Sequence, residues 1–162
     1  MKFDNSDVRR QDRLLDEDRA AQLLRTAEWG VLSMCSDGGE PYGVPLNYVW
    51  DGGSSLYIHC APEGRKLRCL DHEPRASFCI VGRVNLLPAK FTTEYESIVL
   101  TGTVVRGLDD EEKHHALELL LDKLSPHDKQ VGMTYAAKSF HRVEILRLDI
   151  ASWSGKRKAV KG

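Results

Sequence analysis

The sequence has no long apolar run, and this absence narrows the classes of protein that it can encode. No stretch approaches the roughly 20 apolar residues with which a helix crosses a bilayer. Residues 1–13 are charged throughout and lack the apolar segment of a secretory signal. We therefore expect a soluble, cytoplasmic protein without a membrane partner.

Cysteine pairs of the CxxC type are missing as well. The four cysteines stand apart, in or beside apolar runs, at Cys35, Cys60, Cys69 and Cys79. Isolated cysteines in such surroundings are typical of buried, reduced thiols in an intracellular protein. A structural zinc site would need paired ligands at short spacing, so we expect no metal.

The chain also lacks an excess of charge of either sign. Its 23 Lys and Arg residues balance 24 Asp and Glu residues, for a formal net charge of -1. No global field therefore draws the molecule to nucleic acid, and we expect no nucleic-acid partner. The local exception is a basic C-terminal tail with Lys156, Arg157, Lys158 and Lys161.

Hydrophobic patterning predicts a mainly β protein with peripheral helices. Helices are expected over 16–28, 62–72 and 109–124, and about six strands over 31–35, 42–50, 55–60, 75–81, 96–105 and 143–150. Asp-Gly-Gly turns at 37–39 and 51–53 predict two hairpins, so the sheet should be antiparallel. The pattern favours a small closed or split barrel and leaves its topology open; the domain is expected over 13–157, between a flexible segment 1–12 and the tail 158–162.

The most informative segment runs from His59 to Lys66. Pro62 suits the first turn of a helix, which places Arg65 and Lys66 at the positive end of the helix dipole. That placement costs up to about 1 kcal/mol per charge unless an anion is bound there. Gly64 would allow a phosphate to approach the backbone. Alternatively, both cations point to water and are balanced by a nearby acid, and the residues alone favour neither reading.

Three weaker signals accompany this segment. Pro45 stands inside a strand, which predicts an edge, a bulge or a ligand-lining stretch, and Asn47 could bind a planar heterocycle or simply pair with backbone. Trp153, followed by two cations, could cap a flat anionic ligand or begin a disordered tail. A lone strand histidine such as His59 is more often a hydrogen-bonded filler than a catalyst.

Taken in order, five segments resemble the nitroimidazole-resistance (Nim) branch of the pyridoxamine-phosphate-oxidase-like, FMN-binding split barrels. They are residues 41–49, 56–67, 77–82, 88–97 and 153–157, so the resemblance covers nearly all of the chain from Arg13 to Arg157. It implies an antiparallel Greek-key split β-barrel and an FMN-dependent oxidoreductase, in its narrowest form a nitroimidazole reductase. It also implies a homodimer with two flavins at the subunit interface and a small-molecule substrate.

The resemblance also assigns site residues. Those that would line the flavin ring are Val44, Pro45, Leu46 and Asn47, with His59 and Ala61 along the flavin. Arg65 and Lys66 would reach its phosphate. Residues that would approach from the partner subunit or close the pocket are Glu96, Ser97, Trp153, Lys156 and Arg157. His59 is the single catalytic candidate.

One departure limits the implied activity. The end of the chain reads Gly155-Lys156-Arg157-Lys158, without the Arg-x-His-Asp-Arg pattern with which pyridoxamine-phosphate oxidases bind their substrate. Oxidation of pyridoxine vitamers is therefore not expected. The alternative function is a carrier or sensor that binds a flavin or haem without turnover, with His59 as an axial haem ligand. Deazaflavin in place of FMN also stays open.

Overall fold

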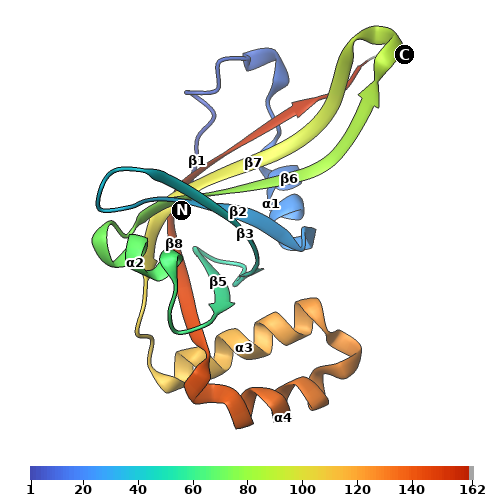
Figure 1. Ribbon diagram of the computed structural model, residues 1–162. Coiled ribbons are helices and arrows are strands. Elements are labelled where there is room, and N and C mark those ends of the chain that lie inside the picture. The colour runs from blue at the N-terminus through green and yellow to red at the C-terminus, as the bar shows by residue number, and fades with distance from the viewer. Residues whose placement is uncertain (161–162) are drawn as a thin grey trace.

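In the computed structural model, residues 1–160 are described, and their strands form a single eight-stranded sheet (Figure 1). The order is β3-β2-β6-β7-β8-β5-β4, with β1 paired to β8, and every contact except that of β1 is antiparallel. The strands are β1 Lys2–Phe3, β2 Trp29–Cys35, β3 Pro41–Asn47, β4 Val49–Trp50, β5 Ser55–Cys60, β6 Arg75–Leu87, β7 Thr92–Val105 and β8 Glu144–Lys158.

The two ends of this strand order are joined in the chain. β3 and β4 lie at opposite ends of the sheet, yet only Tyr48 separates them in sequence. The sheet must therefore curl until its ends meet, which produces the split barrel. The prediction of a mainly antiparallel barrel is confirmed, but the expected strand 42–50 is divided at Tyr48, whose hydroxyl donates to the carbonyl of Leu24 at 2.7 Å.

Four α-helices lie outside the barrel: α1 Glu17–Thr26, α2 Arg65–His72, α3 Asp110–Leu124 and α4 Lys129–Ser139. α1 and α3 were predicted, and each is capped by an aspartate, Asp16 or Asp109. α4 was not predicted, because it has no buried residue and therefore no apolar stripe. It lies against α3 at one end of the barrel (Figure 1), where a Cβ on Gly132 would lie 2.4 Å from Leu121.

The barrel interior is filled by the inward side chains of its strands. Leu32, Phe78, Ile80, Leu100 and Leu146 are fully buried there. A second, smaller apolar cluster forms where α3 covers β4, β5 and β8. No helix within residues 1–160 is long and apolar enough to cross a membrane.

Predicted boundaries are wrong at the long strands, where β6 ends at Leu87 and not at Val81, and β7 begins at Thr92 and not at Glu96. The last strand does not end at Ile150 but continues to Lys158, because β7 is also longer than predicted and Tyr95 pairs with Lys158. Trp153, Lys156 and Arg157 are thus strand residues and do not belong to a tail. β6, β7 and the end of β8 extend beyond the barrel as an arm (Figure 1).

The chain ends were expected to be flexible. At the N-terminus, Lys2–Phe3 pairs in parallel with β8, and Asn5 accepts a hydrogen bond from the amide of Gly155 at 2.9 Å. The mobility of residues 1–12 stays a prediction. Of the basic tail 158–162, residues 161–162 lie outside the described part of the chain.

Candidate functional site

A hollow of about 340 Å³ opens where β3 faces β5. It is lined by Pro45, Leu46 and Asn47 of β3, by Trp29 of β2 and by His59 of β5. β3 pairs only with β2, so it is an edge of the strand order, and the missing N–H of Pro45 removes no bond from a central ladder. The prediction that the Pro45 stretch forms an edge is confirmed, and the same stretch lines a cavity.

The amide of Asn47 is held in place by the backbone that immediately precedes the neighbouring strand β2. Its Nδ2 donates to the carbonyl oxygen of Glu28 at 2.9 Å, so this side chain does pair with backbone. Within residues 1–160, no hydrogen-bond donor reaches its Oδ1. That oxygen is therefore available to accept a hydrogen bond from an N–H group of a ligand in the hollow.

His59 remains accessible from the hollow, while Cys60 next to it faces the other side of β5. The surrounding protein disfavours the charged imidazolium, and the ammonium of Lys66 adds repulsion; both lower the pKa of His59. The imidazole is therefore neutral at pH 7. In that form it can both accept and donate a hydrogen bond.

The cations predicted to hold a phosphate lie at the start of α2. The helix begins at Arg65 and not at Pro62, because Gly64 has φ +137°. This backbone conformation lies outside the helical region, and residues with a side chain rarely adopt it. Arg65 and Lys66 are thus the first two helical residues, as the phosphate-site interpretation requires. The exposed Ala61 and Pro62 belong to the preceding loop.

Both cations are free of ion pairs within the described chain. The Arg65 guanidinium stacks on the ring of Tyr42, 4.4 Å from its centroid, which fixes its position but leaves its N–H groups free. Lys66 lies close enough to Cys60 to oppose the effect of burial, which raises the pKa of that thiol.

The cavity and the cations are connected along β3. Tyr42, under Arg65, is five residues from Asn47, or about 16 Å along a strand. The half-buried side chains of Val44 and Leu46 pack against the core between them. Tyr42 shares this core face, whereas Asn47 lies on the outer face of β3. A flat heterocycle in the hollow with its phosphate at Arg65 and Lys66 would therefore pass over the free edge of this strand.

The remaining predicted residues lie across the sheet from this hollow. Ser97 pairs with Lys156, and Glu96 pairs with Arg157, on β7 and β8. Strands β2 and β6 separate them from β3. Even so, Glu96 lines a second hollow, of about 370 Å³, together with Glu28 and Trp29, and Trp29 is also a wall of the first hollow. Ser97 and Lys156 nevertheless share the outer face of the sheet with Asn47, as the register shows.

Glu96 and Trp153 face the core side. Arg19 of α1 donates to both carboxylate oxygens of Glu96, at 2.6 and 3.0 Å, and these bonds lower the pKa of Glu96. Trp153 is 3% exposed and packs edge-on against Phe3, with ring centroids 4.9 Å apart. Their roles toward a flavin stay predictions.

Sequence reasoning missed two residues of the site, Trp29 and Tyr42. Nothing in the sequence around Trp29, which comes shortly after the first helix, indicates that it is a site residue. Its position could have been found by counting back from the Asp37-Gly38-Gly39 turn, because the hairpin register pairs Cys35 with Pro41 and hence Trp29 with Asn47.

The fold is similar to that of several solved structures. A candidate 5-nitroimidazole antibiotic resistance protein from Bacteroides thetaiotaomicron matches with a TM-score of 0.76 at 22% identity, covering 90% of this chain and 86% of that one. An FAD-binding protein from Mesorhizobium loti matches at 0.65 and 22%, covering 91% and 98%. An FAD and haem binding protein from Mycobacterium smegmatis matches at 0.70 and 22%, covering 93% and 75%.

At these identities the solved structures show the fold alone. No curated protein matches the sequence. The family itself is shown by a family model that matches most of the chain, from the start of α1 through β8 to Arg157. The matched region includes every residue of the hollow and both cations. Over residues 16–157 the chain matches the model described as pyridoxamine 5′-phosphate oxidase, and it belongs to that family.

Proposed function

We propose that this protein is a flavin-dependent oxidoreductase that binds FMN along β3. The observation that carries the proposal is the arrangement on that strand. A hollow with a free amide oxygen and a neutral imidazole lies at one end, and Arg65 lies at the other, stacked on Tyr42. Lys66 lies close enough to His59 and Cys60 to act on both. Neither cation has an ion pair within the described chain. Flavin-binding relatives of the same fold support this assignment.

Each residue then has a distinct role. Arg65 and Lys66 hold the phosphate by charge-assisted hydrogen bonds. The Oδ1 of Asn47 accepts from the N–H edge of the ring. His59, neutral and accessible, is placed to exchange a proton with a substrate above the ring. The bound flavin supplies the electron transfer, and the protein supplies position and polarity.

We further propose that the active form is a homodimer in the cytoplasm. The outer face of the sheet is covered by α3 over β4, β5 and β8 but is exposed around Val81 and Val99. One row of this exposed part is formed by the uncharged residues Val31, Cys79 and Val99. Val81 and Val99 are 49% and 40% exposed. A second copy on this face would bury these side chains and could bring Ser97, Lys156 and Arg157 of its own chain to the hollow.

The substrate class that we propose is small nitro compounds, because a relative of this fold is described as a nitroimidazole resistance protein. The second candidate function is carriage of flavin or haem without turnover. It is favoured by the accessible neutral imidazole of His59, a suitable axial ligand for haem iron.

The visible spectrum of freshly purified protein separates these functions. The proposal predicts a flavin band that bleaches with reduced nicotinamide under anaerobic conditions and returns when a nitroimidazole is added. A flavin band that no reductant and substrate pair cycles would indicate a carrier. A sharp haem band, or a colourless protein that takes up no added FMN, would contradict the flavin assignment.

A further inference from the structure

The arm ends in an exposed aromatic side chain that is held in an unusual backbone conformation. Phe91 lies at the tip, between the turn Pro88–Lys90 and β7, and it is 97% exposed. Its φ of +47° lies in the left-handed region, which bulky residues rarely adopt and which costs on the order of 1–3 kcal/mol. Neither the exposure nor the strain benefits an isolated chain. Both are explained if Phe91 contacts another molecule.

An apolar strip joins this tip to the middle of the sheet. In the β6–β7 register, the partners of Val81, Val84 and Leu86 are every second residue of β7, counted back from Val99. These four side chains therefore share the outer face of the sheet, and all four are exposed. A continuous apolar strip of this kind on a chain surface is typical of a protein–protein interface.

The backbone of the arm is also open along one edge. The register between β2 and β6 ends at Cys79, so β6 has only β7 as a neighbour from there to Leu87. A long, uncharged edge strand with exposed apolar side chains readily associates with another chain. The strip and the free edge lie on the same strand, β6.

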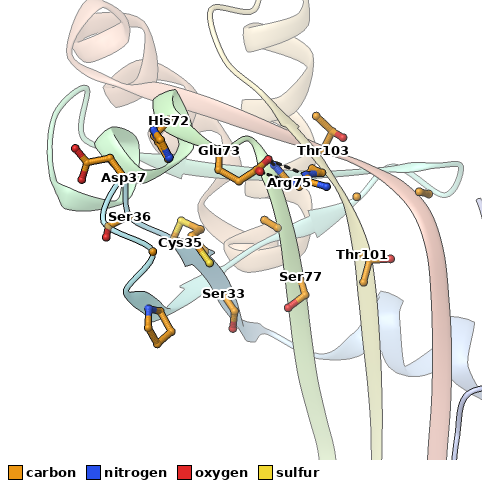
Figure 2. Close-up of a pocket in the computed structure, with 16 residues that line it drawn as sticks. Ser33, Cys35, Ser36, Asp37, His72, Glu73, Arg75, Ser77, Thr101 and Thr103 are labelled. Carbon is orange, nitrogen blue, oxygen red and sulfur yellow. Dashed lines mark hydrogen bonds and ion pairs between the residues drawn. The ribbon is translucent and has the colours of Figure 1, made fainter.

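The opposite end of the outer face is not suited to apolar contact. There the sheet is hollowed, in a space of about 770 Å³ (Figure 2). Ser33, Ser77 and Thr101 form a row across it, next to the row that contains Val99. These short hydroxyl side chains leave little apolar surface to bury, so the interface that the outer face supports lies toward the arm.

A row across five strands shows where a second copy fits. Trp29 pairs with Asn47 in the ring hollow, and Ser97 of β7 pairs with Val81 on one side and Lys156 on the other. Because β2 continues its register with β6 in the same sense, Trp29 lies level with Val81. Val81 is thus the centre of the row, with the hollow at one end and Lys156 at the other.

This row has the layout that a two-fold axis requires. β6 is the middle strand of β3-β2-β6-β7-β8, so an axis along β6 exchanges β3 with β8 and β2 with β7. Lys156 of each copy then lies toward Asn47 of the other. Lys156 forms no ion pair within residues 1–160, and the hollow is lined by no Lys, Arg, Asp or Glu side chain. The second copy thus adds the cation that the hollow lacks.

We infer that the arm is the dimerisation element: the apolar strips of two copies pack together about a two-fold axis along β6, with Leu86 and Phe91 of each at the outer end of the contact. The inference rests on the proposed homodimer. It adds which surface joins the copies, and it gives the arms a function, because the contact between them holds Lys156 of each copy beside the ring hollow of the other.

Cysteine cross-linking of the full-length protein tests the position of the axis, because a residue on the axis meets its own copy. Leu86→Cys, in a Cys79→Ser background that removes the native cysteine of β6, should give a covalent dimer with a short bismaleimide. Cys79→Ser alone should give none. Val131→Cys in the same background, at an exposed position on α4, is the matched control and should also give none.

A second variant tests the contribution of Phe91. Phe91→Gly removes the ring and suits the positive φ, so the fold is retained, as circular dichroism can check. We expect the dissociation constant of the dimer, measured by sedimentation equilibrium, to rise at least tenfold. Ala89→Gly, at an exposed position in the same turn, should leave it unchanged.

The outcomes separate this inference from the proposed function. A dimeric wild type in which Leu86→Cys forms no cross-link, or in which Phe91→Gly associates as tightly as the wild type, would overturn the inference and leave the homodimer standing. A monomeric wild type would overturn both. Binding of FMN to the wild type is measured separately, and its failure would contradict the flavin assignment without affecting the arm contact.

Discussion

At the scale of single residues, the neutral state of His59 depends on its surroundings. We predict that Lys66→Met raises the pKa of His59 toward the ordinary 6.5 without reaching it, because desolvation by the surrounding protein is the larger cause of the lowered value and Lys66 the smaller. An NMR titration of the imidazole measures this. Lys66→Arg, which retains the charge, should leave the pKa low, and an unchanged pKa in Lys66→Met would contradict the prediction.

The same lowered pKa has a consequence for stability. The unfolded chain binds the His59 proton with a pKa near 6.5, more readily than the folded chain does. His59 therefore lowers the free energy of unfolding as the pH falls below about 6.5, and has no such effect well above it.

Glu96 gives the second residue-scale prediction. Its carboxylate is 8% exposed and accepts two bonds from Arg19, so Glu96→Gln should lower the free energy of unfolding by about 1.5–3 kcal/mol. The carboxyl pKa is lowered from 4.5, so this difference is present above pH 4.5 and is lost as the pH falls through the folded-state value.

Urea unfolding of both proteins at pH 7 and at acid pH measures this difference. Glu118→Gln, at an exposed position on α3, is the control and should change stability by less than about 0.5 kcal/mol. If Glu96→Gln lowers the free energy of unfolding by no more than this control, the hydrogen bonds from Arg19 make no net contribution to stability.

Residue-scale sequence reasoning was sound where the signal was local. Arg65 and Lys66 do occupy the first turn of a helix, because dipole and capping effects act within a few residues. The ion pair of Glu96 could not be predicted from the sequence, because its partner Arg19 is 77 positions away. Trp153 likewise meets Phe3 only after β1 pairs with β8.

At the scale of elements, hairpins with Asp-Gly-Gly turns were predictable and long strands were not. The conformation of a tight turn depends on two or three local residues, whereas the length of β8 depends on its pairing with the distant strand β7. The helix α4 depends in the same way on contact with α3 at Gly132.

The β7–β8 ladder is sensitive at the register shift beside Gly102. A Cβ there would lie 2.0 Å from the carbonyl oxygen of Asp149, a backbone atom that cannot easily move. Gly102→Ala should therefore lower the free energy of unfolding by about 1–3 kcal/mol or more. Gly43→Ala meets only side chains at 3.4 Å or beyond and should be nearly neutral. Equal losses in urea unfolding would contradict this account.

At the scale of the whole molecule, barrel closure could not be read from the strand pattern, because the register that joins distant strands is not local.

The exposed part of the outer face predicts a dimer of two 18.3 kDa chains. Val99→Glu places a charge at the centre of that face and should give a folded monomer. Light scattering after gel filtration measures the mass, and circular dichroism checks the fold. A monomeric wild type would contradict the homodimer, and a dimeric Val99→Glu would contradict this face as its interface.

The central claim is that α2 holds a flavin phosphate, and one comparison tests it most directly. FMN and riboflavin differ only in the phosphate, so their affinities for wild type and Lys66→Glu isolate that contact. We predict that Lys66→Glu weakens FMN binding at least tenfold, leaves riboflavin binding unchanged and retains the thermal stability of the wild type. Equal weakening of FMN and riboflavin, or a wild type that binds FMN no better than riboflavin, would contradict the claim.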